Sequence, residues 1–217
     1  MLLVIVKAFQ YAILDSRSWR RGSGVASDSR DRMVRAAVEL FRERGYAATS
    51  FGDVLARSGA PRGSIYHHFP GGKEQLAAEA LRRYTAASVR ALRTVAESAS
   101  AAETVRAFVT ASRDALVASD YRRSCPIAGV ALDLMPADNA LAGHVTEAFA
   151  RWREVLRGAL ERDGVPPARA AALASLAVAS AEGALLLGRA DRSPEPVDET
   201  VDELVAHIEA VVREHAG

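Results

Sequence analysis

The chain has 217 residues, 49% of them hydrophobic, which is enough to bury a core and excludes wholesale disorder. Its single cysteine, Cys125, excludes an internal disulfide and a cysteine-based zinc cluster, and fits a reducing, cytoplasmic setting. The net charge of +1 is unevenly spread: residues 28–73 hold eight Arg and Lys against five Asp and Glu, whereas residues 74–217 hold sixteen against twenty-one. A basic module on an acidic body favours an anionic partner for the first part, although a solvated face would show the same small excess.

The first 14 residues are apolar, but Lys7 interrupts them and the run is too short to span a bilayer. A signal peptide carries its positive charges before the apolar run, whereas the first arginines here follow it. Val25 opens an ordinary N-terminal sequence, and valine can be encoded by a GTG start codon. We therefore interpret residues 1–24 as a non-native or disordered extension and expect no membrane partner. A membrane-anchored protein stays open only if these residues are translated.

Beyond this extension, apolar residues recur with helical spacing, and no segment shows sustained strand alternation. The pattern predicts a helix over residues 28–44 that stops at Gly45. A short helix is predicted over residues 50–58. Its start is a capping box, in which Ser50 caps the amide of Asp53 and the Asp53 carboxylate reaches back.

A sharp turn and a third short helix come next in the sequence. Gly59 suits the turn because glycine takes a positive φ at little cost, and Pro61 suits the first turn of the next helix. Ile65 and Phe69 lie four residues apart and are expected to point into a small core. Three short helices with a tight turn between the last two predict a helix-turn-helix, whose third helix can enter the major groove of DNA.

The remaining chain is predicted to be helical as well, after a break at residues 70–72. The expected helices lie over or around residues 73–98, 105–116, 125–135, 141–160, 166–188 and 197–212, with the fifth ending at Gly188. We therefore predict an all-α fold of about nine helices without an internal repeat.

The stretch "TSFGDVLARSGAPRGSIYHHFPGGKEQL", residues 49–76, resembles the DNA-binding signature of the TetR family of bacterial transcriptional regulators, and the match covers residues 28–80. The form "PGGKEQL" adds one glycine to the usual spacing. Together with "SCPIAGVALDL", residues 124–134, it is similar to the LmrA/YxaF-like branch. The resemblance implies a helix-turn-helix DNA-binding domain over residues 25–72 and a ligand-binding and dimerisation domain over residues 73–217.

The resemblance also implies a homodimer that binds a palindromic double-stranded DNA operator as a repressor and leaves it when a small effector binds. The long helix predicted over residues 73–98 would carry the signal. An activator, or an architectural DNA-binding protein without a ligand, stays open because nothing in the sequence separates these roles from a repressor.

By position, the resemblance assigns DNA contacts to eight residues. Phosphate contacts are implied for Ser50, Ser64, Tyr66, His68 and Lys73, and base contacts for Arg62 and His67, with Gly63 allowing a close approach. The sequence departs from the family pattern twice. Gly52 stands where many members carry a longer polar side chain, and Pro61 replaces a small polar residue. Base recognition is therefore expected to rest more heavily on Arg62.

The second half of the chain offers candidates for an effector pocket, although such side chains at helical spacing are more often plain core. The candidates are Phe108, Leu132, Met135, Phe149 and Trp152, with His144 and Glu182 as polar anchors. Because ligand pockets are mostly apolar, we expect a small lipophilic or aromatic effector, and the LmrA/YxaF-like branch suggests flavonoid- or drug-like compounds. Cys125 stays open between a redox sensor and a buried structural thiol, with the thiol favoured.

Small residues crowd the segment 170–187, which lets helices approach closely. The last two helices are expected to pair with their twofold mates in a four-helix bundle, and tight packing within one subunit is the alternative.

No catalytic, metal or cofactor site is expected. Cys125, His144 and Asp133 have neither the spacing nor the elbow motif of a nucleophilic set, and no phosphate loop or nucleotide fingerprint is present. His67 and His68 are adjacent on a helix, where neighbouring side chains diverge, so they cannot easily share a metal ion.

Overall fold

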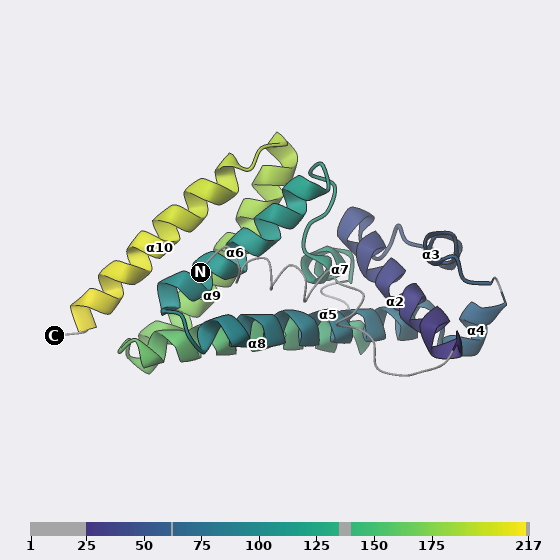
Figure 1. The fold of residues 1–217 in the computed structure, drawn as a ribbon, viewed down its shortest axis with the longest axis horizontal. Helices are drawn as coiled ribbons and strands as arrows, with labels where there is room; N and C mark the ends of the chain where they lie inside the picture. Colours follow the sequence, from purple (N-terminus) through teal and green to yellow (C-terminus); the bar gives the residue numbers. More distant parts are fainter. Residues whose placement is uncertain (1–24, 62, 135–139, 216–217) are drawn as a thin grey trace. The chain divides into compact units, whose positions relative to one another are not determined.

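The computed structural model describes residues 25–61, 63–134 and 140–215. Over these residues all regular structure is helical, which confirms the predicted all-α fold of about nine helices (Figure 1). The helices are α2 (Val25–Arg44), α3 (Phe51–Ser58), α4 (Ser64–His68), α5 (Gly72–Ala96), α6 (Ala101–Ala118), α7 (Pro126–Leu134), α8 (Ala140–Arg162), α9 (Pro167–Asp191) and α10 (Glu195–His215).

The described residues form two compact units. The first, which we call the helix-turn-helix unit, comprises residues 25–86 and 125–148 and contains α2, α3, α4 and α7. The second, the bundle unit, comprises residues 87–124 and 149–215 and contains α6, α9 and α10. Helices α5 and α8 contribute residues to both units.

The helix-turn-helix unit closes on a small apolar core. α2 packs against α3, α4 and α7, and Phe41, Ile65 and Phe69 are at most 2% exposed. The prediction that Ile65 and Phe69 point inward is confirmed. Gly59 follows α3 in the left-handed conformation, at φ 63°, and its amide donates to the carbonyl of Leu55. The predicted turn at Gly59 is therefore also confirmed.

The third short helix begins later than the sequence pattern indicates. Regular helix starts at Ser64 rather than at Pro61. The Ser64 amide and the Ser64 hydroxyl both donate to the Pro61 carbonyl, at 3.0 and 2.6 Å. Because this carbonyl accepts from the residue three positions later and closes a turn, Pro61 belongs to the connection before α4, and α4 itself has only five residues.

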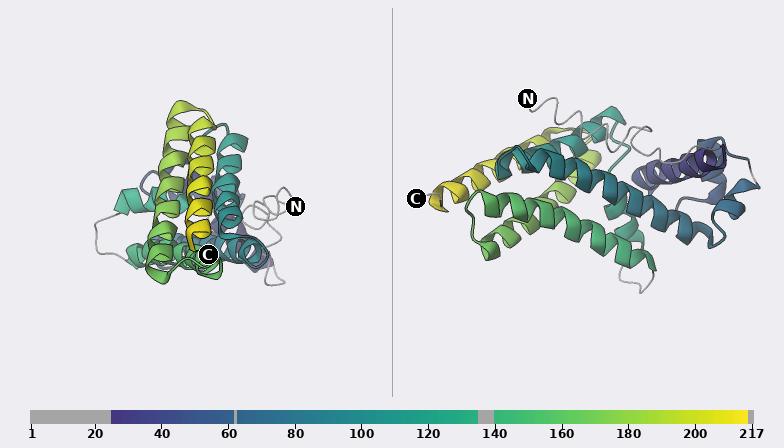
Figure 2. Two further views of the ribbon diagram at one scale, coloured as in Figure 1. Left: turned by 90° about the vertical axis from the view of Figure 1, so that its left-hand side faces the viewer. Right: turned by 60° about the horizontal axis from the view of Figure 1, so that its bottom comes forward.

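In the bundle unit, α6, α9 and α10 pack against one another (left view of Figure 2). Arg113 of α6 donates two hydrogen bonds to Asp198 of α10, at 3.0 and 2.9 Å, and Arg106 donates to Asp202 at 2.7 Å. Because these ion pairs reach solvent, burial of the apolar helix faces contributes more than the charges to holding the helices together.

The predicted end of α9 at Gly188 is wrong. The helix continues to Asp191 and ends at Arg192, which takes the left-handed conformation at φ 52°. Gly188 is a packing residue instead: an added Cβ would lie 2.9 Å from the carbonyl oxygen of Ser193 and 3.2 Å from the side chain of Leu116. A glycine that lets segments approach looks the same in a sequence as one that ends a helix.

Helix α9 also presents an exposed apolar face. Among the described helices it alone is long and apolar enough by composition to cross a membrane, and 44% of its most apolar 18-residue window is buried. Leu176, Leu186 and Leu187 are 46%, 61% and 55% exposed. Packing within the bundle unit thus buries one face of α9, whereas these three leucines are exposed to solvent.

Candidate nucleic-acid interface

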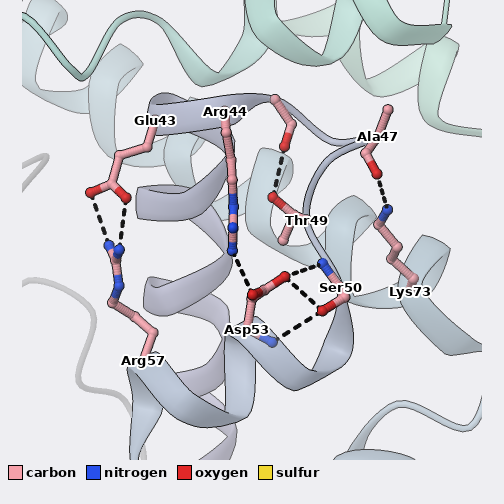
Figure 3. A network of polar contacts seen from close by, with 9 residues as sticks. Glu43, Arg44, Ala47, Thr49, Ser50, Asp53, Arg57 and Lys73 are labelled. Carbon is pink, nitrogen blue, oxygen red and sulfur yellow. Dashed lines mark hydrogen bonds and ion pairs between the residues drawn. The ribbon is translucent and has the colours of Figure 1, made fainter.

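A capping box organises the exposed start of α3 (Figure 3). The Ser50 hydroxyl accepts from the Asp53 amide at 3.2 Å, and Asp53 Oδ2 accepts from the Ser50 amide at 2.8 Å, which confirms the predicted pair. Oδ2 also accepts from the Ser50 hydroxyl at 2.6 Å, and Arg44 lies 2.9 Å from Oδ1. These interactions, the bond with the Ser50 side chain foremost, lower the pKa of Asp53 to about 2. The carboxylate therefore stays ionised and complements the positive start of the helix.

A second ion pair fastens the other end of α3 to α2. Arg57 donates two hydrogen bonds to the Glu43 carboxylate, at 3.0 and 2.7 Å, and the bond to this carboxylate raises the pKa of Arg57 (Figure 3). Together with the Arg44–Asp53 pair, it fixes the direction of α3 on α2 at both ends of the short helix.

Hydrogen bonds hold the loop between α2 and α3, residues 45–49. The Thr49 hydroxyl donates to the Gly45 carbonyl at 2.7 Å, and the Thr49 amide donates to the Tyr46 carbonyl at 3.1 Å. The Ala47 amide donates to Asp133 Oδ2 of α7 at 2.8 Å. The loop that leads into α3 is therefore held by its own polar groups and by a side chain from a distant part of the chain.

Lys73 contacts the same loop from the first turn of α5. Its Nζ donates to the Ala47 carbonyl at 3.4 Å (Figure 3). The same Nζ lies 4.1 Å from the centre of the Tyr46 ring. Burial lowers the pKa of Lys73, and the carboxylates of Asp133 and Asp53 oppose this effect. Lys73 is half-buried, and the Ala47 carbonyl and the Tyr46 ring hold its ammonium group beside the loop that leads into α3.

The short helix α4 presents aromatic and imidazole side chains to solvent. Tyr66 is 67% exposed, and its ring meets the Phe51 ring edge-on with the centres 5.6 Å apart. His67 is exposed, and His68 is half-buried. Burial lowers the pKa of His68, helped by the nearby charges of His67 and Arg30. The outer face of α4 can thus offer a phenol and two imidazoles to a ligand.

The hydroxyl groups of Ser50 and Ser64 are already donating within the unit, so an anion would have to displace these bonds. The amides of Phe51 and Gly52 lie in the first turn of α3, where no carbonyl one turn earlier can accept from them. Backbone amides at a helix start and an ammonium group are both donors that can bind an anion such as phosphate.

Buried ion pairs join α2 to α5 within the same unit. Glu79 of α5 is 4% exposed and accepts hydrogen bonds from Arg30 of α2 and from Arg83 of α5. Arg83 also donates to Asp31 of α2 at 2.6 Å. The network therefore fixes the start of α5, which carries Lys73, against α2.

Of the eight predicted DNA contacts, seven lie among the described residues and all seven belong to the helix-turn-helix unit. They lie on α4, immediately before it, or at the starts of α3 and α5. Arg62, on which base recognition was expected to rest, lies outside the described residues.

Comparison with known proteins identifies this arrangement. Residues 33–80 match the family model of bacterial regulatory proteins, tetR family, and residues 101–203 match the C-terminal domain model of LmrA/YxaF-like transcriptional regulators. An HTH-type transcriptional regulator of Mycobacterium tuberculosis (strain H37Rv) is 40% identical over 174 residues, covering 78% of this chain and 88% of the relative. The HTH-type transcriptional regulator LmrA of Bacillus subtilis (strain 168) is 30% identical over 171 residues, 78% of this chain and 91% of the relative.

The chain belongs to the TetR family of transcriptional regulators. A TetR transcriptional regulator from Chloroflexus aurantiacus has a similar crystal structure, with a TM-score of 0.71, 30% identity, and 85% and 96% of the two chains covered. TetR-family proteins are DNA-binding regulators rather than enzymes, and they usually act as homodimers with small-molecule effectors. The resemblance to the family and to its LmrA/YxaF-like branch is thereby confirmed.

The TetR-family assignment directs attention to the predicted effector residues, three of which meet in the bundle unit. The Trp152 ring lies 5.7 Å from both Phe108 and Phe149, measured between ring centres. Trp152 is 2% exposed and donates from Nε1 to the Ser88 hydroxyl at 2.9 Å, and Glu182 of α9 is half-buried. Phe108 and Trp152 of this aromatic cluster pack as core, and Phe149 is half-buried.

The other predicted effector residues of the TetR-family chain belong to the helix-turn-helix unit or lie outside the described residues. Leu132 on α7 is 81% exposed, and His144 on α8 is half-buried. Met135 lies outside the described residues. Cys125 is 7% exposed, a setting that suits a structural thiol.

Sequence reasoning missed two contributors to the site of this TetR-family chain. From the sequence, Asp133 is a candidate only for a nucleophilic set, and Glu79 has no predicted role. Asp133 bonds to Ala47 across 86 residues, and Glu79 to Arg30 across 49. Local spacing carries no signal for pairs so far apart in the chain.

Proposed function

We propose that the protein is a repressor that binds a palindromic DNA operator as a homodimer and releases it when a small lipophilic or aromatic molecule binds. The observation that carries the DNA-binding part is the exposed face of α4, fixed on a braced unit beside the half-buried Lys73 and the first amides of α3. A surface that is both rigid and rich in donors suits the phosphate backbone and the groove beside it.

In this proposal α4 enters the major groove, with Arg62, Gly63 and His67 toward the bases. Phosphates are contacted from both sides of the groove by Tyr66, His68 and Lys73 and, once their present bonds are exchanged, by the hydroxyls of Ser50 and Ser64. The amides at the start of α3 add the positive end of a helix dipole.

A homodimer is supported by the exposed leucines of α9. Leu176 lines a groove between α9 and α10 of about 580 Å³, together with Leu204 and His207. A second copy could lay its own last two helices into this groove and cover the leucines in a four-helix bundle. One five-residue recognition helix reads few base pairs, whereas two about 34 Å apart read a palindrome.

The effector part of the proposal rests on the aromatic cluster of the bundle unit. Phe108, Phe149 and Trp152 could open around a flat apolar molecule, with Glu182 as a polar anchor. A molecule that binds better to the DNA-incompatible state shifts the population toward it and lowers operator affinity.

The experiment is fluorescence anisotropy of the full chain on DNA from its own upstream region and on scrambled DNA, at several salt concentrations. Arg62→Ala is expected to lose preference for the upstream DNA, at about 1–3 kcal/mol. Lys73→Ala is expected to weaken binding to both DNAs and to lower the salt slope by about 1. Arg90→Ala, which removes an exposed charge from the later part of α5, is the matched control.

Equal binding of the wild type to both DNAs with a steep salt slope would contradict a sequence-specific repressor and favour an architectural role. Release of the upstream DNA by an aromatic compound that also raises the melting temperature supports the effector part. Loss or gain of reporter expression on deletion of the gene separates an activator from a repressor.

Operator binding is expected to strengthen as the pH falls from about 8 to about 6, because a phosphate beside His68 favours its protonated form. The pKa of His68 is lowered in the free protein, and a bound phosphate would raise it. At a pH between these two pKa values, operator binding is therefore accompanied by uptake of a proton. Titrations across this range measure the effect, which should shrink in His68→Gln and persist in His215→Gln, an exposed histidine at the end of α10. An unchanged pH slope in His68→Gln would contradict a phosphate contact.

The pH titration needs a check on folding. Because its folded pKa is lowered, His68 contributes stability that is present above the unfolded pKa of 6.5 and is lost as the pH falls through the lowered folded value. Circular dichroism at each pH separates this loss from the gain in affinity.

A further inference from the structure

We propose that Asp133, on the last turn of α7, is a positioning residue for operator binding. It holds the α2–α3 loop in the conformation that places Lys73 and the start of α3 for a phosphate. The inference deepens the proposed function and rests on it.

The first support is the way the Ala47 residue is held. Its amide donates to Asp133 Oδ2 at 2.8 Å, and its carbonyl accepts from Lys73 Nζ at 3.4 Å. Two side chains from two different helices thus hold the two polar backbone groups of one loop residue. If the hydrogen bond from the Ala47 amide to Asp133 is lost, the Ala47 peptide can rotate and its carbonyl can turn away from Lys73. The lysine then loses the acceptor that fixes the direction of its side chain.

The second support is that two glycines make room for the contact between Asp133 and Ala47. Gly45 has φ +80°, and a Cβ added to it would lie 2.5 Å from Asp133 Oδ2. On α7, a Cβ added to Gly129 would lie 3.2 Å from the Phe41 carbonyl oxygen at the end of α2 and 3.8 Å from the Gly45 Cα. Two glycines therefore face each other where α7 meets the end of α2. Their lack of side chains lets the short Asp133 side chain reach the loop.

The third support is electrostatic. The Asp133 carboxylate acts on Lys73 in the direction that raises the lysine's pKa, against the lowering by burial, and so favours the cationic form. The same negative charge would lie near a phosphate bound by Lys73, where it opposes binding. The hydrogen bond to Ala47 and the charge therefore act in opposite directions on operator affinity, and two substitutions can separate them.

Asp133→Asn keeps an oxygen that accepts from the Ala47 amide and removes the charge, whereas Asp133→Ala removes both. We expect the alanine variant to bind the operator about tenfold more weakly and the asparagine variant to bind at least as tightly as wild type. The salt slope should fall by about 1 in the alanine variant alone, since Lys73 would no longer be placed for its phosphate. Glu154→Ala, an exposed acidic residue on α8, is the control.

The hydrogen bond between Asp133 and Ala47 can also be tested in the absence of DNA. Hydrogen exchange of the segment 45–50, measured on the full chain by mass spectrometry, should speed up in Asp133→Ala and stay near wild type in Asp133→Asn. Exchange elsewhere in α2 and α5 should change little. A general loss of stability would speed exchange throughout the unit and would leave the salt slope unchanged.

The inference is overturned if the alanine variant binds like wild type, or if the alanine and asparagine variants are weakened equally. Unchanged exchange at residues 45–50 in the alanine variant would also overturn it. The wild type could fail to prefer the upstream DNA while hydrogen exchange at this loop still depends on Asp133. That result would contradict the proposed function and would still support a role of Asp133 in holding the loop.

Discussion

Glu79→Ala is expected to lower the free energy of unfolding by about 2–3 kcal/mol and to weaken operator binding strongly. The side chain of Glu79 is 5% exposed and accepts from both Arg30 and Arg83, so its removal leaves two guanidinium groups without their shared carboxylate. The expected loss lies below the usual cost of breaking a buried pair because these arginines are 37% and 26% exposed and can turn to water.

Operator affinity should suffer as well, because the same network holds the start of α5 against α2. Lys73 lies on this part of α5, less than two turns before Glu79. Urea unfolding measures the stability, and anisotropy on the upstream DNA measures the affinity. Glu154→Ala, an exposed acidic residue on α8, is the control. A change below about 0.5 kcal/mol in Glu79→Ala, as is usual for surface substitutions, would contradict the argument.

Trp152→Ala is expected to lower the free energy of unfolding by about 3–5 kcal/mol, the largest effect of any single change considered. The indole is 2% exposed, packs between Phe108 and Phe149, and donates to the Ser88 hydroxyl. Alanine would leave a cavity that these rings can only partly fill, and would remove the hydrogen bond from the indole to the Ser88 hydroxyl.

Trp152→Phe separates packing from hydrogen bonding at this position. It keeps an aromatic ring and removes the indole N–H, so about 1–2 kcal/mol of the loss should remain. Thermal and urea unfolding followed by circular dichroism measure both variants. If alanine and phenylalanine cost the same, the hydrogen bond to Ser88 and not the packing dominates the site. If neither costs more than about 1 kcal/mol, the cluster is not part of the stable core.

Features formed by residues close together in the chain could be predicted. The capping box joins Ser50 and Asp53, three residues apart, and its hydrogen bonds depend only on the local helix start. The inward direction of Ile65 and Phe69 follows from helical periodicity, and the left-handed turn at Gly59 follows from its missing side chain. The dense motif around these residues also sufficed to indicate the family.

Helix ends were predictable only where the terminating signal is local. Gly45 and Gly59 stand in the left-handed conformation directly after their helices, as expected. Gly188 does not, since its lack of a side chain serves the approach of the chain around Ser193 and of Leu116. Pro61 fits a helix start by its own conformation, but its carbonyl closes a turn with Ser64 instead.

The sequence by itself determined the helical elements, the fold class and the family, because each rests on periodicity, caps and motifs that neighbouring residues express. Only the tertiary structure decided which distant side chains complete the interface and the core. Asp133 reaches the Ala47 amide, Glu79 joins α2 to α5, and Trp152 reaches Ser88. These partners are 49 to 86 residues apart in the chain. Such contacts form only when the helices have packed against one another. Their geometry depends on how closely the backbones approach in space and not on the spacing of the residues in the sequence.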